Sequence, residues 1–290
     1  MIHDLHRHLW PEQFLAVLRE RTEAPCLDGW TLHLGDGSYD IEPDAYGAAR
    51  LLAELDRDGI DVALLSLPPT FGLELLSPGE ADALVGAYHD GVLEAVADSG
   101  GRLCALAADR PRDGFVGVCL PATAFVDLEA IAPVLDELQR RDELLFVHPG
   151  LSPAPAGAPP WWQAVVGYTA QMQAAYAAWL GSGIDRWPDL RVLFAILAGG
   201  GPFQLERLRS RGFDARLAQR PTLFFDVASY GNRAIELCLA TLGGGALVFG
   251  TDAPVIDPRP TLAAVRSFGE AVVNVLCRQN PEGLLSARDA

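Results

Sequence analysis

The stretch Leu144–His148 reads LLFVH and is the clearest of a series of short apolar runs on which the fold depends. Its four consecutive apolar residues suit a strand that is buried on both faces, as the strands of a parallel sheet are. Similar runs recur along the chain at Ile2–Leu5, Asp61–Leu67, Leu103–Ala107, Phe115–Leu120, Arg191–Leu197, Leu223–Val227 and Ala246–Gly250. The sequence therefore predicts eight buried strands.

Amphipathic stretches lie between most of these runs and have apolar residues three or four positions apart, as helices that cover a core do. They span Pro43–Asp58, Pro78–Asp98, Asp127–Arg141, Gln163–Gly181, Pro202–Arg211 and Asn232–Leu242. The alternation of strand and helix predicts one α/β domain over residues 1–290, a (β/α)₈ or TIM barrel. An open, doubly wound sheet is the alternative.

Two connections are unusually long and rich in glycine, proline and aromatic residues. Arg21–Glu42 follows the first predicted strand, and Leu151–Trp162 follows the fifth. Both begin at the carboxyl end of a strand, the side on which barrels place their active sites. We therefore expect any functional site to lie at this end of the barrel.

The charge of the chain excludes several classes of partner. The sequence has 38 acidic and 22 basic residues and a net charge of −16. Nucleic acid and anionic membranes attract basic surfaces, so neither is an expected partner.

Five scattered cysteines without a paired spacing indicate reduced thiols, and no basic leader or long apolar segment is present. We expect a cytoplasmic protein that acts on a small molecule.

Three predicted strands end in side chains that can ligate metal ions. His6 and His8 are two residues apart at the end of the first strand, so both imidazoles point to the same side. His148 ends the fifth strand, and Asp252 follows the eighth. A buried histidine or carboxylate needs partners for its polar atoms. Taken singly, each could be chance or a satisfied core residue.

Closing the barrel places the first and eighth strands side by side, with the fifth across the mouth. The four side chains would then converge from distant parts of the chain. Three nitrogens and one oxygen suit Zn²⁺, with Mn²⁺, Fe²⁺ or Co²⁺ as alternatives, and such an ion can activate water. We expect one divalent metal held by His6, His8, His148 and Asp252.

With these residues and the motifs around them, the chain resembles the amidohydrolase-related (amidohydrolase 2) family. This family includes aminocarboxymuconate-semialdehyde decarboxylase-like and resorcylate decarboxylase-like enzymes. Its opening and closing segments are similar to the family's DxHxHxxP and FGTDxP motifs, and its centre to HPG. The segments that carry the resemblance are Asp4–Pro11, Gly114–Val118, Phe146–Gly150, Asp185–Val192 and Phe249–Pro254. They occur in order over nearly the whole chain.

The resemblance implies a metal-dependent TIM barrel, often a homodimer, that hydrolyses or non-oxidatively decarboxylates small carboxylates, frequently aromatic or unsaturated ones. It also implies that the metal ligands are His6, His8, His148 and Asp252. The function expected from it is therefore a mononuclear metal-dependent hydrolase or decarboxylase.

One position departs from the family pattern. After the sixth strand the family typically reads AHxGG, whereas this chain reads FAILAGGGP over Phe194–Pro202, with Ile196 where the histidine belongs. Isoleucine moves no proton, and a histidine acting as acid or base contributes about 10²- to 10⁴-fold in rate. We expect Asp252 to take over proton transfer as the catalytic residue.

Two other functions compete with this expectation. A catalytically altered or inactive relative would bind a small molecule through the retained metal site. A metal-free hydrolase built on Cys119 and His148 is the third reading, although no orienting acid or oxyanion motif accompanies these residues.

Overall fold

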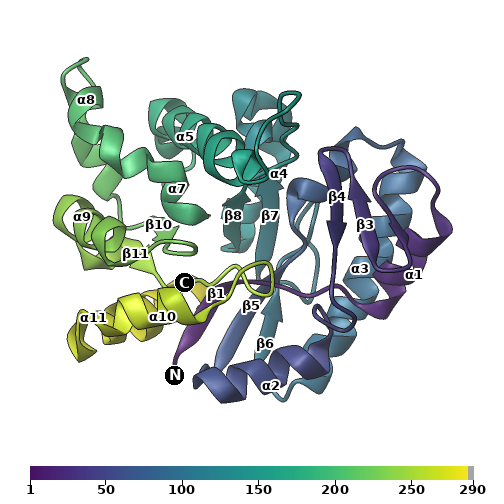
Figure 1. Cartoon of the computed structure of the whole chain (residues 1–290). Helices are drawn as coiled ribbons and strands as arrows, with labels where there is room; N and C mark the ends of the chain where they lie inside the picture. The colour runs from purple at the N-terminus through teal and green to yellow at the C-terminus, as the bar shows by residue number, and fades with distance from the viewer. Residues whose placement is uncertain (287–290) are drawn as a thin grey trace.

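The computed structural model describes residues 1–286 (Figure 1). Each of the eight predicted apolar runs overlaps a strand, so the predicted strands are confirmed. They are β1 (His3–His8), β5 (Val62–Ser66), β6 (Leu103–Ala105), β7 (Gly117–Pro121), β8 (Leu144–His148), β9 (Arg191–Phe194), β10 (Leu223–Asp226) and β11 (Leu247–Val248).

All of these strands pair in parallel, in two sheets with the orders β1-β5-β6 and β11-β10-β9-β8-β7. Backbone hydrogen bonds cross both seams between the sheets. The amide of Leu5 donates to the Phe249 carbonyl at 2.9 Å, and that of Ala107 donates to the Gly117 carbonyl at 2.9 Å. Isolated bridges rather than regular ladders therefore join the sheets, and the predicted α/β barrel class is confirmed.

Helices occupy most of the predicted helical segments. Pro78–Asp98 and Asn232–Leu242 have the predicted bounds, whereas the helix expected from Pro43 begins only at Ala48, after a turn in which the Gly47 amide donates to the Asp44 carbonyl. The α-helices are α1 (Glu12–Glu20), α2 (Ala48–Asp58), α3 (Pro78–Asp98), α4 (Leu128–Arg141), α5 (Tyr168–Ala178), α6 (Ile184–Arg186), α7 (Ile196–Gly200), α8 (Leu205–Arg209), α9 (Asn232–Leu242), α10 (Arg259–Arg266), α11 (Glu270–Asn274) and α12 (Asn280–Leu285).

Shorter helical turns complete the connections. Those of 3₁₀ type are η1 (Pro69–Phe71), η2 (Leu73–Leu75), η3 (Ala122–Val126), η6 (Gly201–Gln204), η7 (Ala215–Gln219) and η8 (Gly244–Ala246). The π-type turns are η4 (Gln163–Gly167), η5 (Trp179–Gly183) and η9 (Val275–Gln279), and the first two extend α5 at its ends.

The connection Arg21–Glu42 holds an antiparallel sheet that the sequence pattern does not predict. It consists of β2 (Cys26–Asp28), β3 (Thr31–Leu34) and β4 (Gly37–Asp40), paired in the order β2-β3-β4. Every residue of β4 is exposed, so the strand has no alternating buried face to reveal it. Figure 1 shows this sheet beside the barrel, next to α1 and α3.

The barrel strands are buried at every residue except Val62, Cys104 and Pro121, which are partly exposed. Phe146, Phe194 and Phe225, on β8, β9 and β10, are fully buried, and the Phe194 and Phe225 rings stack at 6.0 Å. Buried histidine and aspartate side chains occur on β1 and β10 and at the end of β8. Within residues 1–286, no helix is both long and apolar enough to cross a membrane.

Candidate metal centre

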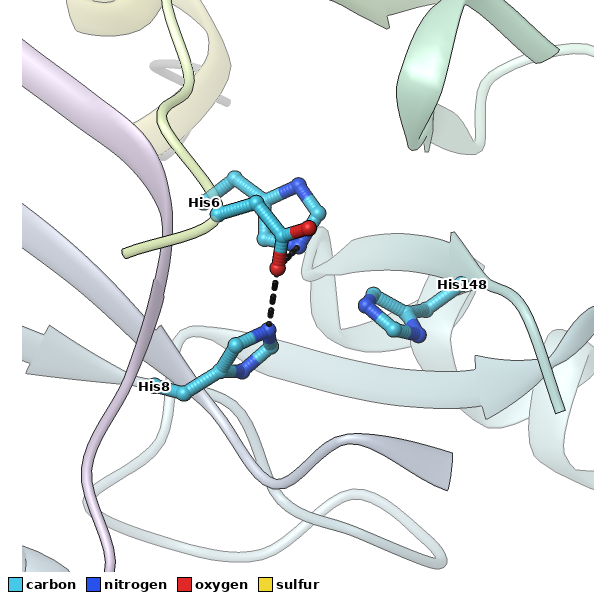
Figure 2. A group of neighbouring side chains, drawn as sticks. His6, His8 and His148 are labelled. Atoms are coloured by element: carbon cyan, nitrogen blue, oxygen red, sulfur yellow. Dashed lines mark hydrogen bonds and ion pairs between the residues drawn. The ribbon is translucent and has the colours of Figure 1, made fainter. Parts of the chain in front are cut away.

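The four side chains predicted to converge do so in the structure. His6 and His8 lie on β1, His148 is the last residue of β8, and Asp252 follows β11. One potential ligand atom from each residue lies within 4.8 Å of all the others. Figure 2 shows the three imidazoles turned toward a common space. All three histidines are buried, and the Asp252 side chain is 18% exposed.

The alternation of side chains along β1 places two of the four candidate ligands, His6 and His8, on the same face of the strand. His6 and His8 face the site, while Arg7 between them points the other way. The Arg7 guanidinium donates to the Glu54 carboxylate at 2.7 Å and is almost completely buried. The predicted orientation of the HxH pair is therefore confirmed.

Each imidazole is held through its Nδ1 atom. His6 Nδ1 lies 2.9 Å from Asp226 Oδ2, His8 Nδ1 lies 3.0 Å from the Ser66 carbonyl, and His148 Nδ1 lies 2.9 Å from the Pro149 carbonyl. All three partners are acceptors, so Nδ1 carries the proton in each ring. The Nε2 lone pairs of the neutral rings are then left for the site, as in metal-ligating histidines held by outer carboxylates and carbonyls.

The space between these atoms requires positive charge. Asp252 Oδ1 lies 3.0 Å from His8 Nε2 and 3.4 Å from His6 Nε2, and His6 Nε2 is buried without a hydrogen-bond partner. A carboxylate oxygen and imidazole lone pairs repel one another unless a proton or a metal cation lies among them. Three nitrogens and an oxygen form a donor set that suits a divalent transition-metal ion. The residues present therefore fit such an ion.

The pKa values of the site residues also reflect the need for positive charge between the histidines and Asp252. Burial lowers the pKa of His6, but the carboxylates of Asp226 and Asp252 outweigh it and raise the pKa to about 9. Burial and the neighbouring His6 and His8 lower the pKa of His148 well below its usual value. For Asp252, burial raises the pKa but the histidines outweigh it and lower the pKa. The site thus favours an ionised carboxylate and a limited number of protons.

Two further carboxylates support the site, and the sequence analysis missed both roles. Asp226 ends β10, and its second oxygen accepts from the amides of Ile196 and Ala228 at 2.9 and 3.0 Å. Asp4 accepts from the Thr251 amide and hydroxyl at 3.0 and 2.6 Å. Asp226 has the same signal as Asp252, since both are carboxylates at the end of an apolar run.

Ile196 lies immediately beyond β9, where the backbone takes an unusual course. Ile196, Leu197, Ala198 and Gly199 have φ angles of 45°, 50°, 49° and 61°. This left-handed turn ends the strand at Phe194, so the predicted continuation to Leu197 is wrong. A β-branched residue such as Ile196 is a genuine outlier in this region, and residues held in such conformations store strain that clusters at functional sites. Ile196 brings no titratable group to the site.

Cys119 does not meet the requirements of a nucleophile. Its side chain is 1% exposed, and burial raises the pKa of the thiol far above its usual value. A thiol held protonated in this way is unreactive. The hypothesis of a metal-free cysteine hydrolase therefore lacks the reactive thiolate that it requires at Cys119.

Comparison with known proteins gives a consistent set of relatives. No protein-family model matches the chain. A curated relative, 2-amino-3-carboxymuconate-6-semialdehyde decarboxylase from Dictyostelium discoideum, is 22% identical, and the alignment covers 92% of this chain and 86% of the relative.

Solved structures share the fold over nearly the whole chain. IDCase from Metarhizium anisopliae has a TM-score of 0.81 at 19% identity and covers 100% of this chain and 98% of its own. 5-Carboxyvanillate decarboxylase LigW from Sphingomonas paucimobilis has a TM-score of 0.75 at 16% identity, with 98% of each chain covered. Dihydroxybenzoic acid decarboxylase from Polaromonas sp. JS666, solved with manganese and the inhibitor 2-nitroresorcinol, has a TM-score of 0.73 at 17% identity, with 100% and 98% covered. The resemblance predicted from the motifs is confirmed.

Proposed function

We propose, on the premise that this chain is a relative of the amidohydrolase-related decarboxylases, that it removes CO₂ from a small aromatic or unsaturated carboxylate with the help of one divalent metal ion. The convergence of His6, His8, His148 and Asp252 carries the proposal. The relatives reported above are decarboxylases, which favours loss of CO₂ over the hydrolysis that the same donor set could also support.

The chemistry divides between the ion and the chain. When bound, the metal supplies a Lewis acid that polarises an oxygen of the substrate. His6, His8, His148 and Asp252 would hold it, and the Nδ1 partners of the three histidines fix the orientation of each ring. Zn²⁺ suits the three nitrogens and one oxygen, and the manganese bound in the Polaromonas decarboxylase makes Mn²⁺ an equal candidate.

Asp252 is the residue that we assign to proton transfer. Decarboxylation leaves a carbon that must take up a proton in place of CO₂, so the site needs a group that can hold and deliver one. Of the four candidate ligands, only Asp252 retains appreciable exposure, and its lowered pKa keeps it ionised, so it must first take up the proton that it delivers to the carbon. Its carboxylate can therefore contact both the histidines and a substrate bound at the mouth of the barrel.

A second candidate function follows from Ile196. The position carries no proton donor or acceptor, so the chain could bind a small carboxylate through the site without converting it.

The backbone at Ile196 allows the alternative to be tested by substitution. Ile196 is 9% exposed and has a left-handed backbone, and histidine tolerates the left-handed region better than isoleucine does. The change Ile196→His is therefore compatible with the local backbone.

The test is turnover of a defined panel. The protein, loaded separately with Mn²⁺ and Zn²⁺, is incubated with aromatic carboxylates that include 2,6-dihydroxybenzoate and 5-carboxyvanillate, and CO₂ release is measured with and without EDTA. We expect metal-dependent CO₂ release from at least one compound, and an increase of about 10²- to 10⁴-fold in Ile196→His but not in Ile196→Leu. Binding without CO₂ release by either the wild type or Ile196→His would favour the non-catalytic alternative.

A further inference from the structure

The ring of His148 is held by a partner that lies outside the barrel strands. The Nδ1 partners of the two histidines of β1 are the Asp226 carboxylate and the Ser66 carbonyl, which belong to β10 and β5. The Nδ1 partner of His148 is the carbonyl of the next residue, Pro149, which lies beyond the end of β8. The strand pairing that fixes the other two acceptors therefore does not include this one.

The local chain does little to fix the peptide group that contains this acceptor. The group joins the Pro149 carbonyl to the Gly150 amide, and glycine places few limits on the backbone dihedral angles beside it. Glycine is favoured here because a Cβ atom on Gly150 would lie 3.0 Å from Thr123 Oγ1 and 3.1 Å from Pro121 Cβ. The long connection Leu151–Trp162 begins directly afterwards. A contact from elsewhere in the chain is needed to hold the carbonyl.

Gln171 of α5 supplies that contact at two points. Its side-chain oxygen accepts from the Gly150 amide and its side-chain nitrogen donates to the Leu151 carbonyl, each at 2.9 Å. The side-chain amide thus pairs with the segment as the backbone of a neighbouring strand would. The helix is itself anchored, because Tyr176 is buried and its ring meets that of Phe225 edge-on at 5.4 Å. Gln171 therefore ties the peptide group to a helix that is packed on the barrel.

The hydrogen bonds of His148 and Gln171 meet on this one peptide group. His148 Nδ1 donates to its carbonyl at 2.9 Å, and its amide donates to Gln171. Because a peptide group is planar, fixing the direction of the N–H also fixes the direction of the C=O. Donation by the N–H also polarises the carbonyl and strengthens it as an acceptor. A ring held at Nδ1 in this way presents its Nε2 lone pair in a defined direction.

We propose that Gln171 is a positioning residue that fixes the ring of His148 through the peptide group between Pro149 and Gly150. The inference rests on the proposed function, in which His148 helps to hold the divalent metal ion. Without Gln171 the carbonyl is free to turn, so the ring loses its fixed orientation and Nε2 is aligned with the other donors for only part of the time. Loss of outer partners lowers metal affinity by about 10- to 100-fold, and the effect of Gln171, which acts through a peptide group, belongs at the lower end.

NMR of the Zn²⁺-loaded protein with isotope-labelled histidines tests this role ring by ring, since Zn²⁺ is diamagnetic. The variant Gln171→Met keeps the length of the side chain but removes both hydrogen bonds. The Nδ1 proton of His148 should then exchange with water about 10-fold faster, whereas those of His6 and His8 should change by less than about 2-fold. The affinity for Zn²⁺, measured by competition with a chelator, should fall by about 10-fold.

Gln173→Met is the matched control on the same helix. Gln173 donates to the Gly199 carbonyl at 2.7 Å, so this variant also removes a hydrogen bond between α5 and a loop. It leaves the partner of the Gly150 amide in place. The Nδ1 proton of His148 should therefore exchange in this variant as it does in the wild type.

Backbone exchange in the wild type gives a second measurement that needs no variant. The Gly150 amide, which Gln171 holds, should exchange about 100-fold more slowly than the amide of Ala156, an exposed residue of the same connection. Equal rates at the two positions would overturn the role of Gln171 even if Gln171→Met does not fold.

The outcomes separate this inference from the proposed function. If the ring proton of His148 keeps its wild-type exchange rate in Gln171→Met, or if all three ring protons accelerate equally, the positioning role is refuted and the proposed function stands. Equal acceleration in Gln173→Met also refutes it, because that result reflects a general disturbance of α5. If Zn²⁺ shifts none of the three ring signals of the wild type, the metal centre is contradicted and both proposals fail.

Discussion

His6 Nδ1 and Asp226 Oδ2 lie 2.9 Å apart, and both side chains are completely inaccessible to solvent. The pair joins β1 to β10 on the inside of the barrel. Because Asp226 Oδ1 also accepts from the Ile196 amide at 2.9 Å, one carboxylate fixes both a candidate ligand and the left-handed turn after β9. The geometry of the centre and the backbone around Ile196 are therefore coupled.

Asp226→Asn should weaken metal binding. An amide can replace the shape of the carboxylate but not its charge, and loss of such outer partners typically lowers metal affinity by about 10- to 100-fold. The dissociation constant for Mn²⁺ or Zn²⁺ is measured by competition with a chromophoric chelator. Asp98→Asn, at an exposed position near the end of α3, is the control. A folded Asp226→Asn protein with wild-type affinity would contradict the proposed support role.

Gly199→Ala should destabilise the fold at the left-handed turn. Gly199 has a φ of 61°, and a Cβ atom there would lie 2.4 Å from the Thr169 carbonyl oxygen of α5. Left-handed strain and overpacking together predict a loss of about 2–4 kcal/mol in the free energy of unfolding, measured in urea. Gly245→Ala is the matched control, because nothing lies within 4 Å of its Cβ position. Equal effects of the two changes would count against the strained turn.

His89 should make stability depend on pH below neutrality. Burial lowers its pKa to about 4, and its Nε2 accepts from the Ala108 amide at 3.0 Å. The unfolded imidazole, with a pKa near 6.5, binds a proton first as the pH falls. The unfolded state thus holds more protons between pH 6.5 and 4, so this contribution is complete above pH 6.5 and is lost toward pH 4, at about 1.4 kcal/mol per pH unit.

The measurement compares the wild type with His89→Gln, whose side-chain oxygen can accept the same amide without titrating. Urea unfolding at several pH values from 7 to 4.5 gives the free energy for each protein. The difference in the free energy of unfolding between the two proteins should change by about 1.4 kcal/mol per pH unit over this range. Parallel curves over this range would show that His89 is not a neutral acceptor in the folded state.

Much of the barrel could be predicted because its strands are buried on both faces. A continuous apolar run such as Leu144–His148 has few other uses in a globular protein, and a polar residue at its end is conspicuous. The sheet of β2, β3 and β4 escaped prediction because its strands are short and β4 is wholly exposed. The left-handed course from Ile196 could not be foreseen, since isoleucine and leucine disfavour it.

The convergence of the four candidate ligands was predictable because a closed barrel brings the ends of its first, fifth and eighth strands together. The spacing of His6 and His8 alone specifies a shared face. The bond between His6 and Asp226 joins the first and seventh strands across β11, and the apolar runs alone do not tell which side-chain atoms meet there. That residues 1–290 form one domain, that the protein is cytoplasmic and that it forms a homodimer stay predictions.

The most direct test of the account is the metal content of the protein. After expression and purification with Mn²⁺ or Zn²⁺ supplied, elemental analysis of the wild type should find about one ion per chain, and anomalous scattering from crystals should place it among His6, His8, His148 and Asp252. His148→Ala should lose most of that metal while keeping its fold. Wild-type protein without bound metal under both conditions, and crystals without density at that position, would contradict the central claim.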